Sequence, residues 1–374
     1  MIKVWDYLKE YDAMREEILD AVDQVFKNGV LVFGPKLQEF EEKFSEYNQC
    51  KFGIGVGNCT DAITIALRAC NIGSGDEVIT TSNTAVPTVT AIVNSGASVK
   101  FVDINEYSLI DVSKITNAIN DKTKAIIPVH LYGQMCDMNA IMDIANKNNL
   151  KVIEDCAQAH GATYFGKKAG SIGDIGCYSF YPTKIFGAYG DGGFITTNKE
   201  NLFDKMQRIR FLGMERKKMS SGHWNGKYYA VEHGTNSRLD EVHAAILLKK
   251  LPYLDEWINR RRQIAERYNR ELKDTNLELP KEHKDNKHAY YIYVVAHKDR
   301  DQIMKSLTEK NIHLNISYPW PIHIMDAYKH FVCSTCDCLT KTEDMAKKIF
   351  SLPMYPTLTD DEQGEVIKEL KKII

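Results

Sequence analysis

Short segments rich in β-branched residues alternate with helical segments between residue 52 and about residue 200, and this alternation constrains the fold more than any other feature. The segments are FGIGVG (52–57), EVITT (77–81), SVKFVDI (98–104), KAIIPVH (124–130), KVIED (151–155) and CYSFY (177–181). Helical patterns such as DMNAIMDIANKNN (137–149) separate several of them. Continuous apolar strands separated by helices predict an α/β fold, with a mostly parallel mixed sheet between helices. In such a sheet, the ligand binds beyond the carboxyl ends of the strands.

The chain has 374 residues, which is long for one hydrophobic core and predicts two domains. Two helical stretches, 237–251 and 253–273, are separated at Pro252. The strand HAYYIYVVAHK and the helices RDQIMKSLTEKN and DEQGEVIKELKKII follow. We therefore predict a large domain over residues 1–250, with an N-terminal helical arm at 12–28 that ends at Gly29. A smaller C-terminal α+β domain is expected over residues 251–374.

Charge and hydropathy argue against several classes of function. The net charge is −2 and the sequence pI is about 6.6, so there is no electrostatic case for binding nucleic acid or an anionic membrane. The basic run at 260–262 is interpreted as a solvated helix face. No segment has the length and hydropathy of a membrane span, and the N-terminus does not resemble a secretory signal. We therefore expect a cytoplasmic protein.

Nine cysteines are scattered along the chain, and both their odd number and their spacing argue against a disulfide framework. One cluster, Cys333, Cys336 and Cys338, has His330 nearby. Three thiols and a histidine can bind zinc, but a structural zinc site usually pairs two separated ligand groups and no second group is visible. We interpret these residues as free thiols and expect no metal.

Lys184 lies in SFYPTKIFGAYGDGG (179–193), between a predicted strand and Gly190, Gly192 and Gly193. An amine among apolar groups has a lowered pKa and can attack a carbonyl, and the glycines leave room for a ligand. Such a lysine can hold an aldehyde cofactor as a Schiff base. Taken alone, Lys184 is more simply interpreted as a loop lysine.

Two acidic residues, Glu154 and Asp155, end the predicted strand in VIEDCAQAHGA (152–162). Consecutive strand residues point to opposite faces, so one carboxylate can enter the site while the other points away. Asp155 is the candidate to keep a pyridinium nitrogen protonated, as pyridoxal phosphate chemistry requires. Glu154 is interpreted as an ordinary polar strand end.

An anion site is predicted in GIGVGNCTDAITIALRA (53–69), where a strand passes through glycines into a helix. The backbone N–H groups at the helix N-terminus and the Thr60 hydroxyl can hold a phosphate. The glycine spacing differs from the dinucleotide-binding fingerprint, which argues against a nicotinamide dehydrogenase. A plain strand-to-helix turn is the alternative.

The order of these three elements resembles the DegT/DnrJ/EryC1/StrS family of sugar-nucleotide aminotransferases, which use pyridoxal phosphate and have fold type I. The resemblance extends over nearly the whole chain. It includes VFGPKLQEFEEKF (32–44), VGNCTDAITIAL (56–67), VHLYGQMCDM (129–138), NSRLDEVHAAIL (236–247), YPWPIH (318–323) and SLPMYP (351–356).

The resemblance implies a role for each matching residue. Lys184 matches the Schiff-base lysine that also moves the proton, Asp155 matches the pyridinium partner, and Gln158 matches the residue that bonds the ring hydroxyl. The implied phosphate-binding residues are Gly57, Cys59, Thr60, Ser179 and, from the neighbouring subunit, Asn236. The active unit implied is thus a homodimer with shared active sites. The implied substrate residues are Tyr181, Tyr318 and His323, and packing in a proline-rich loop is the alternative for Tyr318 and His323.

Two positions depart from the family pattern. The family often has an aromatic residue that stacks on the cofactor ring where this chain has Ala85. The family often has glycine before the threonine of the phosphate site, where this chain has Cys59. A thiol near an aldehyde introduces a potential side reaction.

The resemblance implies a reaction in two halves, in which glutamate leaves pyridoxamine phosphate and a keto sugar then takes the amine. Relatives with histidine at the position of Lys184 are dehydratases, so lysine argues against that outcome. The motif YPTK…GAYGDGG resembles that of enzymes which act on dTDP-3-keto-6-deoxyhexoses and give a dTDP-3-amino-3,6-dideoxyhexose. The alternatives are a 4-keto-6-deoxyhexose nucleotide, another small keto acceptor, or a non-catalytic regulator that binds the cofactor.

Overall fold

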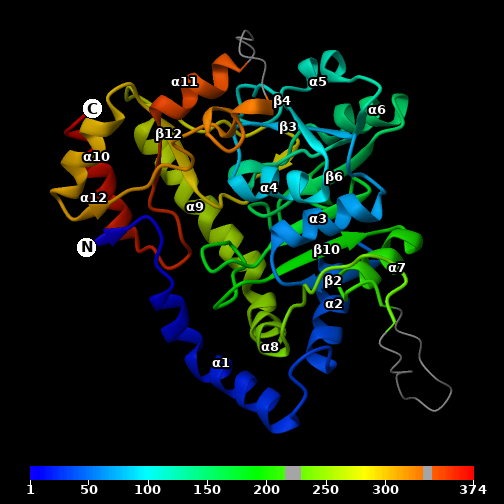
Figure 1. Ribbon diagram of the computed structural model, residues 1–374. Helices are drawn as coiled ribbons and strands as arrows, with labels where there is room; N and C mark the ends of the chain where they lie inside the picture. The colour runs from blue at the N-terminus through cyan, green and yellow to red at the C-terminus, as the bar shows by residue number, and fades with distance from the viewer. Residues whose placement is uncertain (215–228, 332–338) are drawn as a thin grey trace.

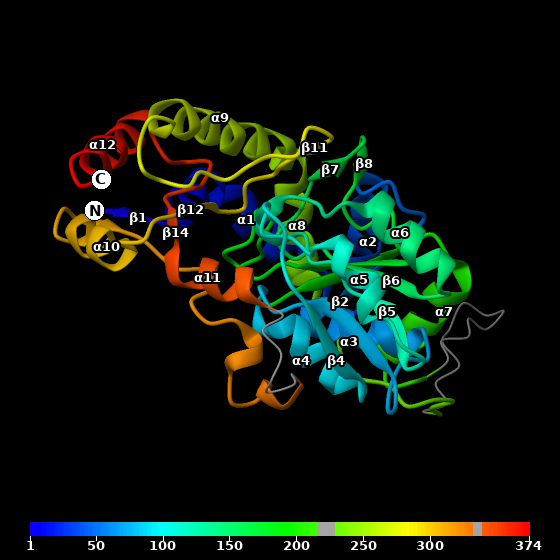
Figure 2. The ribbon, with the colours of Figure 1, turned by 90° about the horizontal axis from the view of Figure 1, so that it is seen from above.

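The computed structural model of the chain describes residues 1–214, 229–331 and 339–374. Cys333, Cys336 and Cys338, which were interpreted as free thiols, lie outside these residues. In Figures 1 and 2, a large sheet with helices on both faces occupies one side of the molecule, and the helices that follow residue 253 gather on the other side. Of the helices in the described part of the chain, none combines the length and the apolar character needed to span a membrane.

The large sheet has seven strands in the order β2-β10-β9-β6-β5-β3-β4. Along this order, the strands are Phe52–Val56, Gly193–Thr197, Ile175–Ser179, Lys151–Asp155, Thr123–Ile126, Glu77–Thr81 and Ser98–Val102. All neighbouring pairs are parallel except those of β10, which is antiparallel to both β2 and β9. The predicted mostly parallel mixed sheet is therefore confirmed.

Helices cover both faces of this sheet. One layer contains α2 (Pro35–Tyr47), α5 (Val112–Ala118), α6 (Met138–Lys147) and α8 (Glu241–Lys250). The other layer contains α3 (Cys59–Ala69), α4 (Val86–Ser95) and α7 (Glu200–Ile209). Strand residues alternate between the two layers, as the pleat requires, so that Val152 packs into the first core and Ile153 into the second.

A third hydrophobic core lies between the elements that follow α8. These elements are α9 (Leu254–Leu272), β12 (Tyr293–Ala296), α10 (Arg300–Thr308), β13 (Ile312–His313), β14 (Ile349–Leu352) and α12 (Asp360–Lys371). Helix α11 (Thr340–Lys348) belongs to the same part of the chain, but its Met345 packs against the first core. Strands β12 and β14 pair antiparallel. A small three-stranded sheet is formed by β7 (Thr163–Tyr164), β8 (Lys167–Lys168) and β11 (Asn286–Lys287). Short 3-10 turns occur at residues 131–133, 251–253, 322–324 and 329–331.

The first residues of the chain pack with its C-terminal part. Strand β1 (Ile2–Lys3) pairs in parallel with β13, and Figure 2 shows it beside α10. Helix α1 (Leu8–Asn28) then packs against α8, and it ends at Gly29, whose positive φ of 73° gives a left-handed cap. The helical arm and its end at Gly29 agree with the sequence prediction. The division into domains at residue 250 stays a prediction.

Two local predictions were wrong. The strand expected at 177–181 spans 175–179, so Tyr181 lies beyond the strand rather than in it. The basic run at 260–262 is not uniformly solvated, because Arg261 is buried and donates to the carbonyl oxygens of Tyr291 (3.0 Å) and Met354 (2.9 Å). Burial lowers the pKa of Arg261 to about 10. Its guanidinium joins α9 to two segments that are distant in sequence.

The N-terminus of α2 is capped by a carboxylate from another helix. Glu241 of α8 is buried and accepts from the backbone N–H groups of Gly34 (2.8 Å), Leu37 (2.8 Å) and Lys36 (2.9 Å). A negative charge is stabilised at this end of a helix, where the first N–H groups lack intrahelical acceptors. Glu241 therefore holds α2 against α8 in the first of the two helical layers.

Candidate active site

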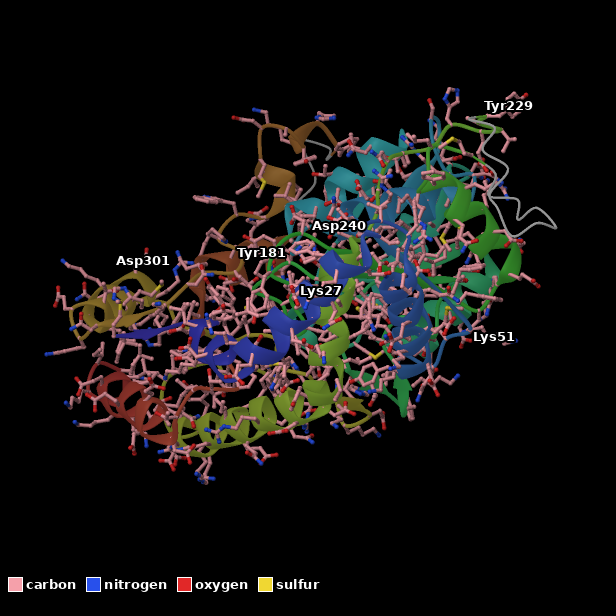
Figure 3. The ribbon with its side chains drawn as sticks, turned by 90° about the horizontal axis from the view of Figure 1, so that it is seen from below. Lys27, Lys51, Tyr181, Tyr229, Asp240 and Asp301 are labelled. Atoms are coloured by element: carbon pink, nitrogen blue, oxygen red, sulfur yellow. The ribbon has the colours of Figure 1, made fainter. Side chains whose placement is uncertain are left out.

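A cavity of about 420 Å³ lies at the carboxyl ends of β6 and β9. Eight residues predicted for the site line it: Cys59, Thr60, Asp155, Gln158, Ser179, Tyr181, Lys184 and Tyr318. They come from α3, from the ends of β6 and β9, from the loops that follow, and from the segment at 315–318. Tyr181, labelled in the view from below in Figure 3, is 52% exposed. The structure thus brings together most of the residues that the sequence predicted for the site.

Asp155, the last residue of β6, is buried at the cavity. Its Oδ2 accepts from the Thr88 hydroxyl (2.7 Å) and its Oδ1 from the Ala157 N–H (3.1 Å). Burial raises the pKa of Asp155, while these two hydrogen bonds and the nearby Lys184 amine act in the opposite direction. A buried carboxylate with few donors is stabilised by a cationic partner in the cavity.

Lys184 lies in the tight turn after β9, and its Nζ is 4.7 Å from the ring centroid of Tyr291. The predicted lowering of its pKa was wrong. Burial does lower it, but the phenol oxygens of Tyr291 and Tyr318 and the Asp155 carboxylate outweigh burial, so the pKa is raised above its usual value. In the apoprotein the amine is therefore held as an ammonium group, which must lose a proton before it attacks a carbonyl.

The turn that carries Lys184 is held from behind by a second lysine. Lys250 of α8 is buried, and its Nζ donates to the Gly187 carbonyl (2.5 Å) and pairs with Glu10 of α1 (2.7 Å). A side chain at Gly187 would clash with the backbone of Pro182, since a Cβ there would lie 2.5 Å from its carbonyl oxygen. The tightness of the turn thus requires glycine, and α1 and α8 together fix its backbone.

The predicted anion site lies at the N-terminus of α3. The Asn58 side chain caps this helix by accepting from the Asp61 N–H (2.8 Å), while the first backbone N–H groups of a helix lack intrahelical acceptors. Ser179 faces the same cavity, and because its Oγ accepts from the Tyr181 N–H (3.3 Å), its own proton is available to an anion. Cys59, Thr60 and Ser179 can therefore hold a phosphate together.

The thiol of Cys59 was expected to introduce a potential side reaction with an aldehyde. Burial raises the pKa of Cys59 well above its usual value, so the sulfur stays protonated. Because the thiolate is the nucleophilic form, the structure argues against this reactivity.

Three predicted residues do not line the cavity in this chain: Gly57, Asn236 and His323. The Gly57 N–H donates to Ser237 Oγ (2.9 Å), so it is not free to bind an anion. Asn236 is exposed, and its backbone forms a bridge with Phe211. His323 is buried, and both of its ring nitrogens already have partners, the Ser82 hydroxyl (2.7 Å) and the Glu343 carboxylate (3.1 Å). Its role toward the substrate stays a prediction.

Sequence reasoning missed three residues that shape the site: Thr88, Tyr132 and Tyr291. Thr88 lies in the first turn of α4, and no motif in the sequence marks it as a contact of Asp155. Ala85, where an aromatic residue was expected, lines the cavity with its methyl group alone. The contacts of Thr88 and Tyr291 with Asp155 and Lys184 join segments that are distant in sequence, so no local pattern reveals them.

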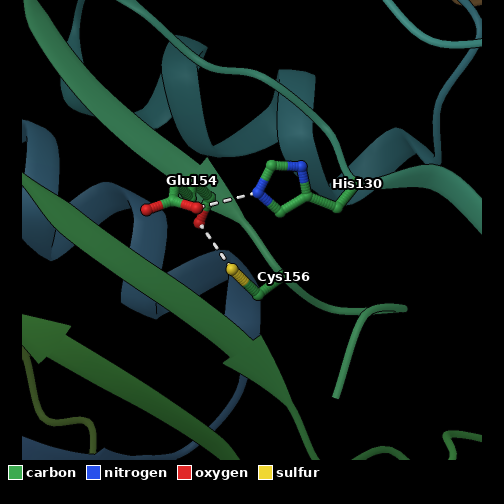
Figure 4. A group of neighbouring side chains, drawn as sticks. All are labelled: His130, Glu154 and Cys156. Carbon is green, nitrogen blue, oxygen red and sulfur yellow. Dashed lines mark hydrogen bonds and ion pairs between the residues drawn. The ribbon is translucent and has the colours of Figure 1, made fainter. Parts of the chain in front are cut away.

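Glu154 was interpreted as an ordinary polar strand end, and this was wrong. Its carboxylate is fully buried and accepts from His130 Nε2 (2.9 Å) and from the N–H groups of Gly170 (2.9 Å) and Gly173 (2.6 Å). Figure 4 shows the cluster that it forms with His130 and Cys156. Burial raises the pKa of Glu154, but the His130 bond and the amide donors outweigh it, and the pKa is lowered. The pKa of His130 is raised to about 10, because its contacts with Cys136 and Glu154 outweigh burial, so a protonated imidazole and the amide donors together balance the charge of Glu154.

The donor set of the cavity fits pyridoxal phosphate. Asp155 offers a buried carboxylate for a protonated ring nitrogen, and Lys184 offers the amine for the aldehyde. The N-terminus of α3 and Ser179 offer donors for the phosphate. All of these groups line one cavity, as a single cofactor requires.

A model of the DegT/DnrJ/EryC1/StrS aminotransferase family matches residues 12–371. The chain belongs to this family. One relative of this aminotransferase, the dTDP-3-amino-3,4,6-trideoxy-alpha-D-glucose transaminase of Micromonospora megalomicea subsp. nigra, is 45% identical over 99% of this chain and 98% of its own length. Another, the dTDP-3-amino-3,6-dideoxy-alpha-D-galactopyranose transaminase of Aneurinibacillus thermoaerophilus, is 42% identical over 96% of this chain and 95% of its own length.

Solved structures of relatives have the same fold as this aminotransferase. DesV from S. venezuelae, solved in complex with a ketimine intermediate, superimposes with a TM-score of 0.93 at 33% identity, covering 98% of this chain and 96% of its own. NtdA from Bacillus subtilis, solved with bound cofactor PMP, has a TM-score of 0.88 at 34% identity, covering 96% of this chain and 82% of its own. The predicted family, fold type I and cofactor are confirmed, and this chain is an aminotransferase that uses pyridoxal phosphate.

The Thr88 hydroxyl is expected to control the ionisation of Asp155. In Thr88→Val, Asp155 loses a donor, so its pKa rises further and a smaller fraction is ionised at a given pH. Because the ring nitrogen needs the carboxylate, we expect cofactor affinity to fall about 10-fold. The loss of affinity on acidification should also begin at a higher pH than in the wild type.

The measurement is the dissociation constant of pyridoxamine phosphate as a function of pH. Thr90→Val is the matched control, since Thr90 lies on the same helix and its hydroxyl bonds Tyr328 (2.8 Å) instead. Identical pH profiles for Thr88→Val and the wild type would contradict the role of Thr88.

Glu154 is expected to make stability depend on acid pH. Its pKa is lowered on folding, so its contribution is present above its unfolded value of about 4.3 and is lost as pH falls below that value. Glu154→Gln should cost about 3 kcal/mol near pH 7, and the difference from the wild type should shrink in acid. Urea unfolding from pH 7 to pH 3 measures this, with the exposed Glu16→Gln as control; a difference that stays constant with pH argues against the assignment.

Proposed function

We propose that this aminotransferase moves an amino group from glutamate to a dTDP-3-keto-6-deoxyhexose and gives a dTDP-3-amino-3,6-dideoxyhexose. The observation that carries the proposal is the convergence of Lys184, Asp155 and the α3 N-terminus on one cavity. The substrate class is supported by the names of the two relatives, which are both transaminases of dTDP-3-amino sugars. The sequence motif around Lys184 favours the same substrate class.

The residues of the chain divide the chemical work. Pyridoxal phosphate supplies, when bound, the carbonyl that accepts the amino group and the ring that takes up electrons. Asp155 holds a proton on the ring nitrogen through its buried carboxylate. Lys184 Nζ takes and returns the proton at the carbon that loses or gains the amino group. The N-terminus of α3 and Ser179 hold the phosphate, and burial of the cavity floor excludes water from these steps.

The small side chain at position 85 leaves space in the cavity for the sugar. Ala85 and Pro87 line the cavity with little volume, and Tyr181 lies at its exposed side. Tyr318 presents a half-buried phenol whose oxygen accepts from Gln158 Nε2 (2.8 Å), so its own proton is available to a bound oxygen. We assign Tyr181 and Tyr318 to the sugar nucleotide.

We further propose that a second copy of this chain completes the site. Helix α1 and the segment after it expose the apolar side chains of Leu8, Leu19, Phe26, Val30 and Leu31. Figure 1 shows α1 on the outside of the molecule. An exposed apolar surface of this kind is typical of a subunit interface. Asn236 is exposed and does not line the cavity of its own chain, in keeping with a role in the site of the partner subunit.

The substrate proposal is tested with the purified chain, pyridoxal phosphate and glutamate, followed by a dTDP-3-keto or a dTDP-4-keto-6-deoxyhexose. We expect glutamate to change the visible absorption of the bound cofactor, and the 3-keto sugar alone to restore it. Mass spectrometry should then show an amino sugar nucleotide. Lys184→Ala is the control and should lose nearly all turnover. Restoration by the 4-keto sugar alone would replace the substrate, and no response to glutamate would favour a non-catalytic regulator.

Shared active sites are tested by mixing two inactive variants. Lys184→Ala and Asn236→Ala should each have little activity, because each lacks one group of every site. In a mixed dimer, one site receives both substitutions and the other receives neither, so we expect mixing after mild denaturation and refolding to restore about a quarter of wild-type activity. Refolding each variant alone is the control. Failure of the mixture to regain activity would remove Asn236 from the site of the partner subunit.

A further inference from the structure

Tyr132, which contacts residues that line the cavity, has an unusual backbone conformation. It lies in the 3-10 turn at 131–133 with φ 62° and ψ −2°, and it is buried. A bulky residue seldom adopts a positive φ, and such strained residues persist where surrounding contacts hold them. Tyr132 itself does not line the cavity. Its conformation therefore calls for an explanation in the groups that it contacts.

All three polar groups of Tyr132 contact the cavity wall. Its N–H donates to Gln158 Oε1 (2.8 Å) and its carbonyl accepts from the Tyr291 N–H (2.9 Å). Its hydroxyl donates to the Ser317 carbonyl (2.6 Å). Gln158, Tyr291 and Ser317 all line the cavity, and they belong to three segments far apart in sequence.

These contacts close a ring of hydrogen bonds. Gln158 Nε2 donates to the Tyr318 hydroxyl (2.8 Å), and Tyr318 follows Ser317, which Tyr132 holds. Three hydrogen bonds thus link Tyr132 to Gln158, Gln158 to Tyr318, and Ser317 to Tyr132. The peptide bond between Ser317 and Tyr318 closes the path, which we call the hydrogen-bond ring. Burial raises the pKa of Tyr132, so its hydroxyl stays protonated and remains a donor.

We propose that Tyr132 is a positioning residue of the aminotransferase, which orients Gln158 and Tyr318 toward the cofactor and substrate. The inference rests on the proposed function in taking Gln158 and Tyr318 as contacts of the bound groups. The positive φ aims the N–H, the carbonyl and the side chain of one residue at three segments. A residue in an ordinary strand or helix conformation at this point would direct the N–H and carbonyl elsewhere.

The test is a double-mutant cycle with Tyr132→Phe, Tyr318→Phe and the double variant. Tyr132→Phe keeps the aromatic side chain and the backbone bonds, and it removes only the hydrogen bond to Ser317. The readout is the dissociation constant of pyridoxamine phosphate, which binds without a covalent bond to Lys184 and needs neither glutamate nor a sugar. The result therefore stands even if the proposed substrate is wrong.

We expect Tyr132→Phe to weaken pyridoxamine phosphate about 5-fold, the effect of one lost hydrogen bond. Because both residues act through one ring, the double variant should bind no more than about 2-fold more weakly than Tyr318→Phe. Tyr268→Phe is the matched control: Tyr268 is buried in the third core and its hydroxyl donates to the Pro353 carbonyl (3.1 Å). It should leave the dissociation constant unchanged.

Thermal unfolding of each apoprotein separates this role from a purely structural one. Both Tyr132→Phe and Tyr268→Phe lose a buried hydrogen bond, so both should lower the unfolding temperature. If Tyr132→Phe lowers the unfolding temperature and leaves pyridoxamine phosphate affinity at the wild-type value, the proposal is overturned. Independent, multiplicative effects of the Tyr132 and Tyr318 substitutions would overturn it as well.

Discussion

The buried carboxylate of Asp155 is the interaction on which the arrangement of the cavity depends. Removing a charge from water is costly unless donors and a cation replace the solvent. Thr88 and the Ala157 N–H supply part of that replacement, and they come from α4 and from the loop after β6. The Lys184 ammonium group supplies a further part in the apoprotein, and a protonated cofactor ring would supply the rest. In the apoprotein the buried Asp155 carboxylate is incompletely stabilised, and a bound cofactor would complete its stabilisation. Cofactor binding should therefore stabilise the folded site.

Asp155 and Glu154 show how one strand separates a functional charge from a structural one. The pleat sends the two carboxylates to opposite faces of β6. Asp155 has two donors and a raised pKa, whereas Glu154 has His130 and several amide donors and a lowered pKa. Because both side chains are buried, their partners decide the outcome: Glu154 contacts a protonated His130 as well as amides, whereas both donors to Asp155 are neutral. Glu154 fixes the loop at 170–173 behind the strand, so that Asp155 can face the cavity with few bonds of its own.

Residues whose roles follow from local pattern were predicted from the sequence. The strand-to-helix turn before Thr60, the strand end at Asp155 and the glycines after Lys184 each have a recognisable order, and their convergence follows from parallel strands. Thr88, Tyr132 and Arg261 could not be predicted, because their partners lie tens to hundreds of residues away. The raised pKa of Lys184 was missed for the same reason: it depends on Tyr291 and Tyr318, which reach the cavity from the C-terminal part of the chain.

The antiparallel direction of β10 fixes both ends of the loop that carries Lys184. A connection from β9 to a parallel neighbour would need a crossover of a dozen or more residues and would carry the chain to the far end of the sheet. Because β10 runs the opposite way, the segment from 180 to 192 leaves β9 and enters β10 at the same end of the sheet. Both ends of the loop are thus joined to paired strands at the same end of the sheet. Transfer of the Lys184 amine between two bonding partners therefore requires only rotation about the bonds of its side chain and no displacement of the strands.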